Sequence, residues 1–356
     1  MIRLEPRERV PLVLAVAAPV VAAAAALALA AIPLAIAGAS PFRAYALMAQ
    51  GAAGSLFAFS ETLGRATPLI LTGLAVAVAF RAKLYNIGAE GQLYAGALAA
   101  VAVGSGAFTL PPILMLPIVL IAGALAGAFL MLVPTLFKVK LGVDEVMTTL
   151  LLNFIVLLFV QMMIEGPMKD PMSAGWPQSE PIVDAAMLPK FAERMRVHWG
   201  LVVALVAAAA VHVIMRHTVA GFEIRAVGEN PNAARFAGIK VTRVLIRAGL
   251  ISGALAGLAG VGEVAGLKGY LTQDLSPGFG YAGIVVAMLA GLSPLGVVIA
   301  ALFIAGVFVG SDSMSRAVGV SNYIADLVVA LSLVMMLLGG LVTRYRILLV
   351  APRGAH

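Results

Sequence analysis

Ten apolar stretches, separated by short polar segments, run along almost the whole chain. They lie at residues 11–37, 62–80, 91–107, 113–137, 143–164, 199–215, 244–262, 279–292, 295–311 and 323–343. Most are long enough to cross about 30 Å of hydrocarbon, since an α-helix rises about 1.5 Å per residue. The short stretch 279–292 is flanked by Pro277 and Pro294, a pattern compatible with a half-helix, a re-entrant segment or a buried broken helix. The pattern predicts an all-α polytopic membrane protein with about ten transmembrane helices in one domain, residues 1–356.

Composition supports the membrane class. Apolar residues make up 62% of the chain and charged residues 12%, and the mean hydropathy is +1.04. A soluble core could not hide so much apolar surface. The chain has no cysteine, which excludes disulfides and thiolate metal sites, and its four histidines show no metal-ligand spacing.

The positive charge indicates topology rather than a nucleic-acid partner. The chain carries a net charge of +7, and basic residues in membrane proteins concentrate in cytoplasmic loops. Ten crossings with both termini in the cytoplasm place most of the 24 lysines and arginines on that side. In this orientation the proline-containing segment 165–198 is the largest external loop, and the basic segment 216–247 is a cytoplasmic loop.

Two strings in the sequence are similar and indicate an internal repeat. YAGALAAVAVG at 94–104 resembles YAGIVVAMLAG at 281–291. The strings belong to the third and eighth apolar stretches, so they are five crossings apart. An odd offset gives repeats of opposite orientation, an arrangement found in many transporters. The pattern is compatible with a 5+5 inverted repeat.

The motifs of common enzyme classes are missing from the sequence. There is no GxxxxGK[ST], no GxSxG and no HExxH. A formal GxGxxG, GFGYAG at 278–283, lacks the surrounding βαβ unit of a dinucleotide site. We therefore expect no catalytic residue, no metal site and no cofactor in this chain.

A first group of candidate residues lies where the third helix begins. Asn86, Gly88, Glu90 and Gln92 are polar or flexible positions in an otherwise apolar region. Exposed backbone groups at a helix break bind polar substrate atoms when they line a cavity, so these residues are candidates for a translocation pathway. The alternative is a purely structural role, with Asn86 capping the helix start and Glu90 complementing its dipole.

A second group lies on one face of the fifth helix. Glu145, Thr149 and Asn153 are spaced i, i+4 and i+8, and Asn153 is expected near the middle of the membrane. There it must face protein or water rather than lipid. Thr149 and Asn153 are therefore further pathway candidates, and helix–helix hydrogen bonding is the alternative. On the seventh helix, Gly249, Gly253 and Gly257 form GxxxG spacings that predict close helix packing.

The basic loop 216–247 contains a short, well-bracketed helix. Asn230 suits the N-cap, Pro231 the first helical position and Gly238 the position just past the helix end. The loop's arginines and lysines would also attract lipid headgroups, but that attraction does not explain a capped helix of about two turns. A short helix that presents Arg235 and Phe236 suits docking into a groove on another protein.

Four segments carry a specific resemblance. LYNIGAEGQLYAGA, GVDEVMTTLLLNFIV, GENPNAARFAGIKV and GYAGIVVAMLAGLSPLG occur in this order. They resemble the permease subunits of ATP-binding-cassette (ABC) importers of the branched-chain amino acid and ribose type. The closest resemblance is to nucleoside permeases that work with basic-membrane-protein-type binding lipoproteins, and it runs from about residue 60 to 343.

The resemblance implies a division of labour between several chains in a bacterial plasma (inner) membrane. An extracytoplasmic binding protein would deliver a nucleoside, and this chain would form the path with a second permease, a different and shorter one. A separate cytoplasmic ATPase would bind ATP and engage the loop helix. By matching motif, the coupling residues are Glu229, Asn230, Pro231, Asn232, Ala233, Arg235, Phe236 and Gly238.

Three alternatives stay open from the residues. The same type of permease could carry ribose-like sugars or branched-chain amino acids. An ion-coupled secondary transporter is less favoured, because Asn153 is not ionisable and Asp326 is expected near the outer end of the last helix. A membrane enzyme is less favoured still, for want of any catalytic constellation.

Overall fold

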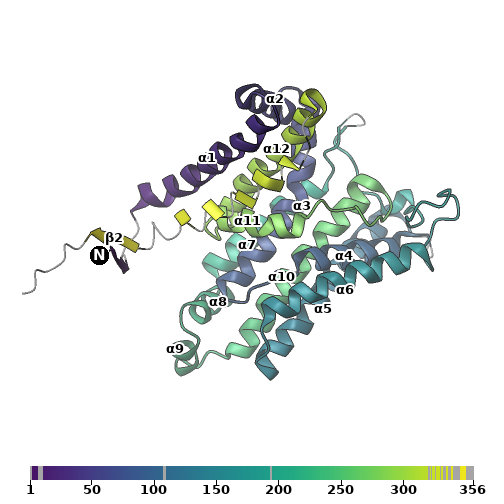
Figure 1. Ribbon diagram of the computed structural model, residues 1–356. Coiled ribbons are helices and arrows are strands. Elements are labelled where there is room, and N and C mark those ends of the chain that lie inside the picture. The colour runs from purple at the N-terminus through teal and green to yellow at the C-terminus, as the bar shows by residue number, and fades with distance from the viewer. Residues whose placement is uncertain are drawn as a thin grey trace, which may run out of the picture. The chain divides into compact units, whose positions relative to one another are not determined.

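The computed structural model describes most of the chain, in two units. The described residues are 2–6, 11–106, 110–192, 195–319, 321, 323–324, 326–328, 330–331, 334–335, 338–339 and 345–349. One unit, the terminal unit, comprises Met1–Gly51 and Gly310–His356; the other, the central unit, is Ala52–Val309. Figure 1 shows their elements.

The central unit is helical. Its elements are α3 (Leu56–Arg81), α4 (Ala89–Gly104), α5 (Pro112–Leu141), α6 (Glu145–Glu165), a 3-10 turn (Asp184–Ala186), α7 (Gly200–His217), α8 (Val219–Glu229), α9 (Pro231–Phe236), α10 (Val241–Glu263), a π-helical turn (Val264–Lys268) and α11 (Phe279–Leu289), followed by α12 (Pro294–Val318), within which the division between the units falls. α10 packs against α3, α4 and α5 and is the centre of this unit (Figure 1).

The terminal unit contains α1 (Leu12–Ile36), α2 (Pro41–Ala53, of which the last two residues fall in the central unit) and two short strands. The strands β1 (Ile2–Pro6) and β2 (Tyr345–Leu349) pair antiparallel, with Ile2 opposite Leu349. The all-α class predicted from the sequence is confirmed for the membrane part of the chain, and these two short strands are an addition to it. They lie outside the apolar stretches on which that prediction rested, and two strands from opposite ends of a chain leave no local signal of their pairing.

Among the described residues, six helices are long and apolar enough to cross a membrane. They are α3, α5, α6, α7, α10 with its π-helical turn, and α12. A bent pair of helices, Val20–Ile36 and Pro41–Ala53, meets at an angle of 116°. If this pair is one span, the number rises to seven. α4 has 16 residues and α11 has 11, so both are shorter than a full span. The multi-pass membrane class is confirmed. The count of ten, the inverted repeat and the cytoplasmic termini stay predictions, and part of the stretch 323–343 lies outside the described residues.

Glycines let α10 approach its neighbours closely, as the GxxxG spacing predicts. A β-carbon built on Gly253 would lie 2.3 Å from the carbonyl oxygen of Gly127 on α5, and one on Gly257 would lie 2.2 Å from that of Gly123. Further along α10, a β-carbon on Gly260 would lie 1.9 Å from the carbonyl oxygen of Leu93 on α4. Backbone therefore packs directly on backbone along α10, which fixes α4 and α5 in place.

Candidate functional site

A non-helical segment joins α3 to α4, and its residues Ala82, Leu84, Asn86 and Gly88 are buried in the central unit. After α3 the chain turns at Lys83, which has a φ of 52°, and residues 84–87 form no regular helix or strand. Leu84 and Asn86 are fully buried and lie in the core. A non-helical segment inside a membrane protein must find partners for its backbone polar groups elsewhere. We call residues 82–88 the core segment.

The side chain of Asn86 anchors the core segment to α10. Its Nδ2 donates to the Oε1 of Gln92 and to the Oγ of Ser252, both at 2.9 Å. Its Oδ1 accepts from the backbone N–H of Gly88 at 2.9 Å and from the Nε2 of Gln92 at 3.0 Å. Gly88, not Asn86, occupies the N-cap position of α4. Asn86 and Gln92 thus form a reciprocal amide pair in which both polar atoms of the Asn86 side chain have partners.

The polar row on α6 holds the other side of the core segment. Glu145 accepts from the backbone N–H of Tyr85 at 3.0 Å and forms an ion pair with Lys138. One turn further, the Oγ1 of Thr149 accepts from the N–H of Ile87 at 3.3 Å. The three row residues Glu145, Thr149 and Asn153 are buried. The i, i+4, i+8 face predicted from the sequence therefore serves the backbone of the core segment, as the edge of a neighbouring strand would.

Asn153 reaches three separate elements. Its Oδ1 accepts from the N–H of Gly91 in the first turn of α4 at 2.8 Å. Its Nδ2 donates to the carbonyl oxygen of Ile87 at 3.0 Å and to the hydroxyl of Tyr281 on α11 at 3.1 Å. The residue is fully buried, so it faces protein, as expected for an amide inside a membrane.

Glu90 joins α4 to α11. Its Oε2 accepts from the backbone N–H of Gly280 at 2.6 Å, and the hydroxyl of Ser276 also hydrogen-bonds it. The oxygen of Ser276 in turn accepts from the N–H groups of Gly278 and Phe279, at 3.1 and 2.9 Å. The structure thus brings the pathway candidates of 86–92 together with the start of the short helix α11.

The two tyrosines of the repeated string make crosswise contacts. Tyr94 of α4 donates to the carbonyl oxygen of Gln273 at 2.6 Å and accepts from the N–H of Ser276 at 3.2 Å, so it holds the segment before α11. Tyr281 of α11 accepts from Asn153, which also binds the start of α4. Each short helix therefore carries a tyrosine that binds the surroundings of the other.

The predicted loop helix is present as the six-residue α9. The Oδ1 of Asn230 accepts from the N–H groups of Asn232 and Ala233 at 3.0 and 3.1 Å, and Pro231 is the first helical residue. Gly238 has a φ of +84°, and the following N–H bonds back to the carbonyl oxygen of Ala234, which closes the helix. The predicted cap, first residue and terminator are confirmed.

α9 presents an unpacked surface. The side chain of Phe236 is 93% exposed, and Glu229, Arg235 and Gly238 are exposed as well. Ala234 was not among the coupling residues predicted from the sequence, and it is the one residue of α9 that is buried. An exposed aromatic beside an arginine is the arrangement expected of a docking surface.

The loop helix connects to the core segment through α8 and α3. A β-carbon built on Gly228 would lie 1.9 Å from the carbonyl oxygen of Arg81 at the end of α3. Glu223 of α8 forms an ion pair with Arg247 of α10 at 2.9 Å. The guanidinium of Arg81 donates to the carbonyl oxygen of Gly291, just beyond α11, at 3.3 Å. The end of α3 therefore contacts α8 directly and reaches the residues just beyond α11 through the side chain of Arg81.

Some residues of this network were missed in the sequence. Ser252 lies inside the glycine-rich part of α10 and donates to the carbonyl oxygen of Ala75 at 2.7 Å while accepting from Asn86. A lone serine in an apolar helix indicates a hydrogen bond to a neighbouring helix, and this signal was present in the sequence. Ser276 precedes Pro277 and Gly278, and this sequence is typical of a helix start. That pattern was the signal from which Ser276 could have been predicted as a capping residue.

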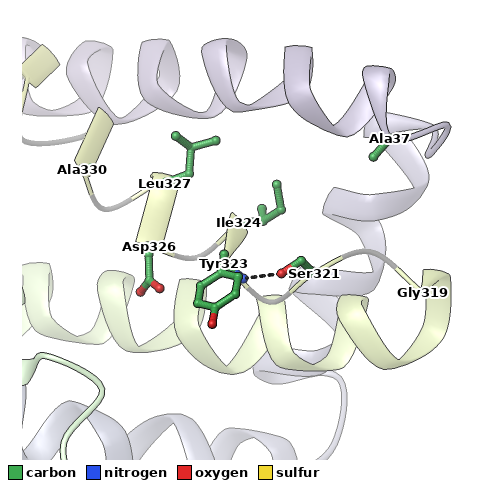
Figure 2. Close-up of a pocket in the computed structure, with 8 residues that line it drawn as sticks. All are labelled: Ala37, Gly319, Ser321, Tyr323, Ile324, Asp326, Leu327 and Ala330. Atoms are coloured by element: carbon green, nitrogen blue, oxygen red, sulfur yellow. Dashed lines mark hydrogen bonds between the residues drawn. The ribbon is translucent and has the colours of Figure 1, made fainter.

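A separate cavity lies in the terminal unit. Its volume is about 720 Å³, and it is lined by Ala37, Gly319, Ser321, Tyr323, Ile324, Asp326, Leu327 and Ala330. Figure 2 shows Asp326 and Tyr323 beside it, with the N–H of Tyr323 donating to the Oγ of Ser321 at 3.3 Å. None of the pathway candidates lines this cavity. Within the described residues, no group of three or more potential ligands is placed to hold a metal.

Comparisons with known proteins agree on one class of transporter. The family model described as "Branched-chain amino acid transport system / permease component" matches residues 58–339. The chain is 38% identical to the glucose ABC transporter permease protein of Haloferax volcanii, over 97% of this chain and 93% of the relative. It is 36% identical to the guanosine ABC transporter permease protein of Bacillus subtilis, over 88% and 90% of the two chains. It is 34% identical to the nucleoside ABC transporter permease protein of Lactococcus lactis, over 84% of each. No solved structure matches the chain.

Proposed function

We propose that this chain, which belongs to the permease-component family of branched-chain amino acid transport systems, is the subunit of an ABC importer that carries nucleosides. Membership of the family makes it an ABC importer permease with several membrane-crossing helices. The nucleoside assignment rests on the guanosine and nucleoside permeases among its relatives, together with the four motifs quoted from the sequence.

Two features support coupling to an ATPase: α9 is exposed, and its base, the preceding helix α8, is fixed in place. Phe236 lies free at the end of a helix of only six residues, which a partner must stabilise by packing. The base is fixed because Glu223 of α8 is paired with Arg247, and Gly228 lies against Arg81. We assign Glu229 to Gly238 as the surface on which a cytoplasmic ATPase docks, and we expect Phe236 to be its anchor.

A displacement of α9 would be transmitted through a few contacts to the residues that hydrogen-bond the core segment. α8 presses on the last residue of α3 with no intervening side chain, and the core segment begins at the next residue. Asn86 and the α6 row hold that segment against α4, α6 and α10. We propose that nucleoside passes beside this network, and that ATPase movements at α9 reposition the core segment with α4 and α11.

The other partners follow from the family. A binding protein outside would deliver the nucleoside, and a second permease chain would complete the path. The chain contains no P-loop motif, so ATP binds on the separate ATPase subunit. We place the assembly in a bacterial inner membrane, with segment 165–198 facing outwards and segment 216–247 facing the cytoplasm.

Glucose is the second candidate substrate, because the relative from Haloferax volcanii is 38% identical over nearly the whole chain. An uptake experiment separates the candidates. Labelled guanosine, uridine, glucose and leucine would be offered to cells with and without this chain, each with and without ATP depletion. We expect loss of ATP-dependent guanosine or uridine uptake in the cells that lack the chain. Loss of glucose or leucine uptake alone would overturn the nucleoside assignment and leave the permease class intact.

A further inference from the structure

The N-termini of two short helices meet inside the central unit. A β-carbon built on Gly280, in the first turn of α11, would lie 2.2 Å from the backbone nitrogen of Glu90, in the first turn of α4. Each helix N-terminus carries a partial positive charge and several N–H groups without intrahelical partners. Two such ends in contact repel each other unless a negative group lies between them.

The position of this junction is away from the ends of the long helices. The hydroxyl of Thr72 donates to the carbonyl oxygen of Phe279 at 3.0 Å. Thr72 lies nine residues before Arg81, the last residue of α3, which corresponds to about 14 Å at about 1.5 Å per residue. In transporters, broken helices with N-termini at such depth often receive an anionic substrate group or ion.

Here the protein supplies the anion. Glu90 is only 3% exposed, and its carboxylate accepts from the N–H of Gly280 at 2.6 Å and bonds to Ser276. Within the described part of the chain, no lysine or arginine forms an ion pair with it. A buried carboxylate without a cationic partner requires another source of positive potential, and the two helix ends provide one.

We propose that Glu90 is an internal anion that holds the N-termini of α4 and α11 together, a positioning residue of the translocation core. The placement of this core beside the substrate path rests on the proposed function. Because the carboxylate already occupies the N–H group of Gly280, the junction offers that donor to no substrate carboxylate or phosphate. This arrangement suits a substrate without negative charge. Nucleosides and glucose are both uncharged.

The test is chemical rescue of Glu90→Ala, measured as the melting temperature of the purified transporter complex in detergent. The substitution removes a group the size of acetate. We expect formate and acetate to raise the melting temperature of Glu90→Ala, whereas the neutral isosteres formamide and acetamide have no effect. Neither series should change the wild type or the control Glu180→Ala, whose residue is exposed. Equal rescue by the neutral compounds would overturn the proposal.

A second variant keeps the test decisive if Glu90→Ala does not fold. Glu90→Gln preserves shape and an acceptor oxygen but removes the charge. We expect its melting temperature to fall by about 5 °C and its uptake to drop, because the hydrogen bond from Gly280 to a charged acceptor becomes a weaker bond to a neutral one. A melting temperature equal to that of the wild type would show that charge is not needed. Neither melting experiment involves the cargo, so their failure differs from failure of the nucleoside assignment.

Discussion

The backbone of Gly228 in α8 rests directly on the carbonyl oxygen of Arg81 at the end of α3. A β-carbon at Gly228 would lie 1.9 Å from that oxygen, a distance at which the two helices must separate. The side chain of Arg81 continues the chain of contacts to the carbonyl oxygen of Gly291, beyond the end of α11. A single backbone contact thus connects α8, in the loop 216–247, with the helix that leads into the core segment.

Gly228→Ala should therefore uncouple transport. The added methyl group would push α8 away from α3, and we expect at least about a tenfold loss of ATP-driven uptake, since packed interfaces do not deform continuously. Gly306→Ala on α12 is the matched control, because the nearest atom to its β-carbon would lie 3.6 Å away, an ordinary contact. Uptake and membrane content would be measured for both. Normal uptake in Gly228→Ala would show that the contact does not transmit movement.

The double substitution Arg235→Ala with Phe236→Ala tests the docking surface. Phe236 is 93% exposed, so its removal should leave the fold and membrane insertion intact. As an interface anchor it should contribute enough that ATPase binding weakens by at least about tenfold and uptake is lost. Co-purification of the ATPase subunit from detergent is the measurement. Trp176→Ala, an exposed aromatic in the segment 165–198, serves as the control. Full ATPase binding in the double mutant would contradict the assignment of α9.

Asn153→Ala distinguishes a structural role from a pathway role. The substitution leaves the N–H of Gly91 and the carbonyl of Ile87 without their partner, so we expect a loss of about 2–4 kcal/mol in the free energy of unfolding. Gln161→Ala on the same helix removes two exposed hydrogen bonds, one to Glu165 and one from Gln273, and should change stability by less than about 0.5 kcal/mol. Denaturation in detergent measures both. Loss of uptake with unchanged stability would instead favour direct contact with the substrate.

The features predicted correctly from the sequence depend on neighbours along the chain. α9 was predictable because Asn230, Pro231 and Gly238 each act within one helical turn. The polar face of α6 was predictable because Glu145, Thr149 and Asn153 repeat with the helical period. The close packing of α10 followed from its glycine spacing.

The partners of these residues could not be predicted, because they lie far away in sequence. Asn86 bonds to Ser252 and Glu90 to Gly280, and no periodicity relates residues so distant. Hydropathy also does not fix the number of spans, for a physical reason. A half-helix such as α11 is as apolar as a full span, so hydropathy alone does not separate the two.

The buried His198 makes stability depend on pH. It is 2% exposed, its Nδ1 accepts from the N–H of Gly200 at 3.1 Å, and it lies directly against Gly266. Burial, with a smaller contribution from the charge of Lys190, lowers the pKa of His198 from 6.5 to about 4. The folded protein therefore keeps this histidine neutral at pH values where the unfolded chain binds a proton.

The direction of the effect follows from proton binding. Between pH 6.5 and 4 the unfolded state holds more protons at this position, so stability falls as the pH falls through this range. A pKa lowered from 6.5 to about 4 corresponds to about 3 kcal/mol lost by pH 4. His198→Asn keeps an acceptor for Gly200 but does not titrate, so its melting temperature should fall less than that of the wild type between pH 8 and pH 4.5. At pH 8 both proteins should melt within a few degrees of each other. Parallel pH profiles for the two proteins would show that protonation of His198 does not oppose folding, because the remaining titrating groups are common to both.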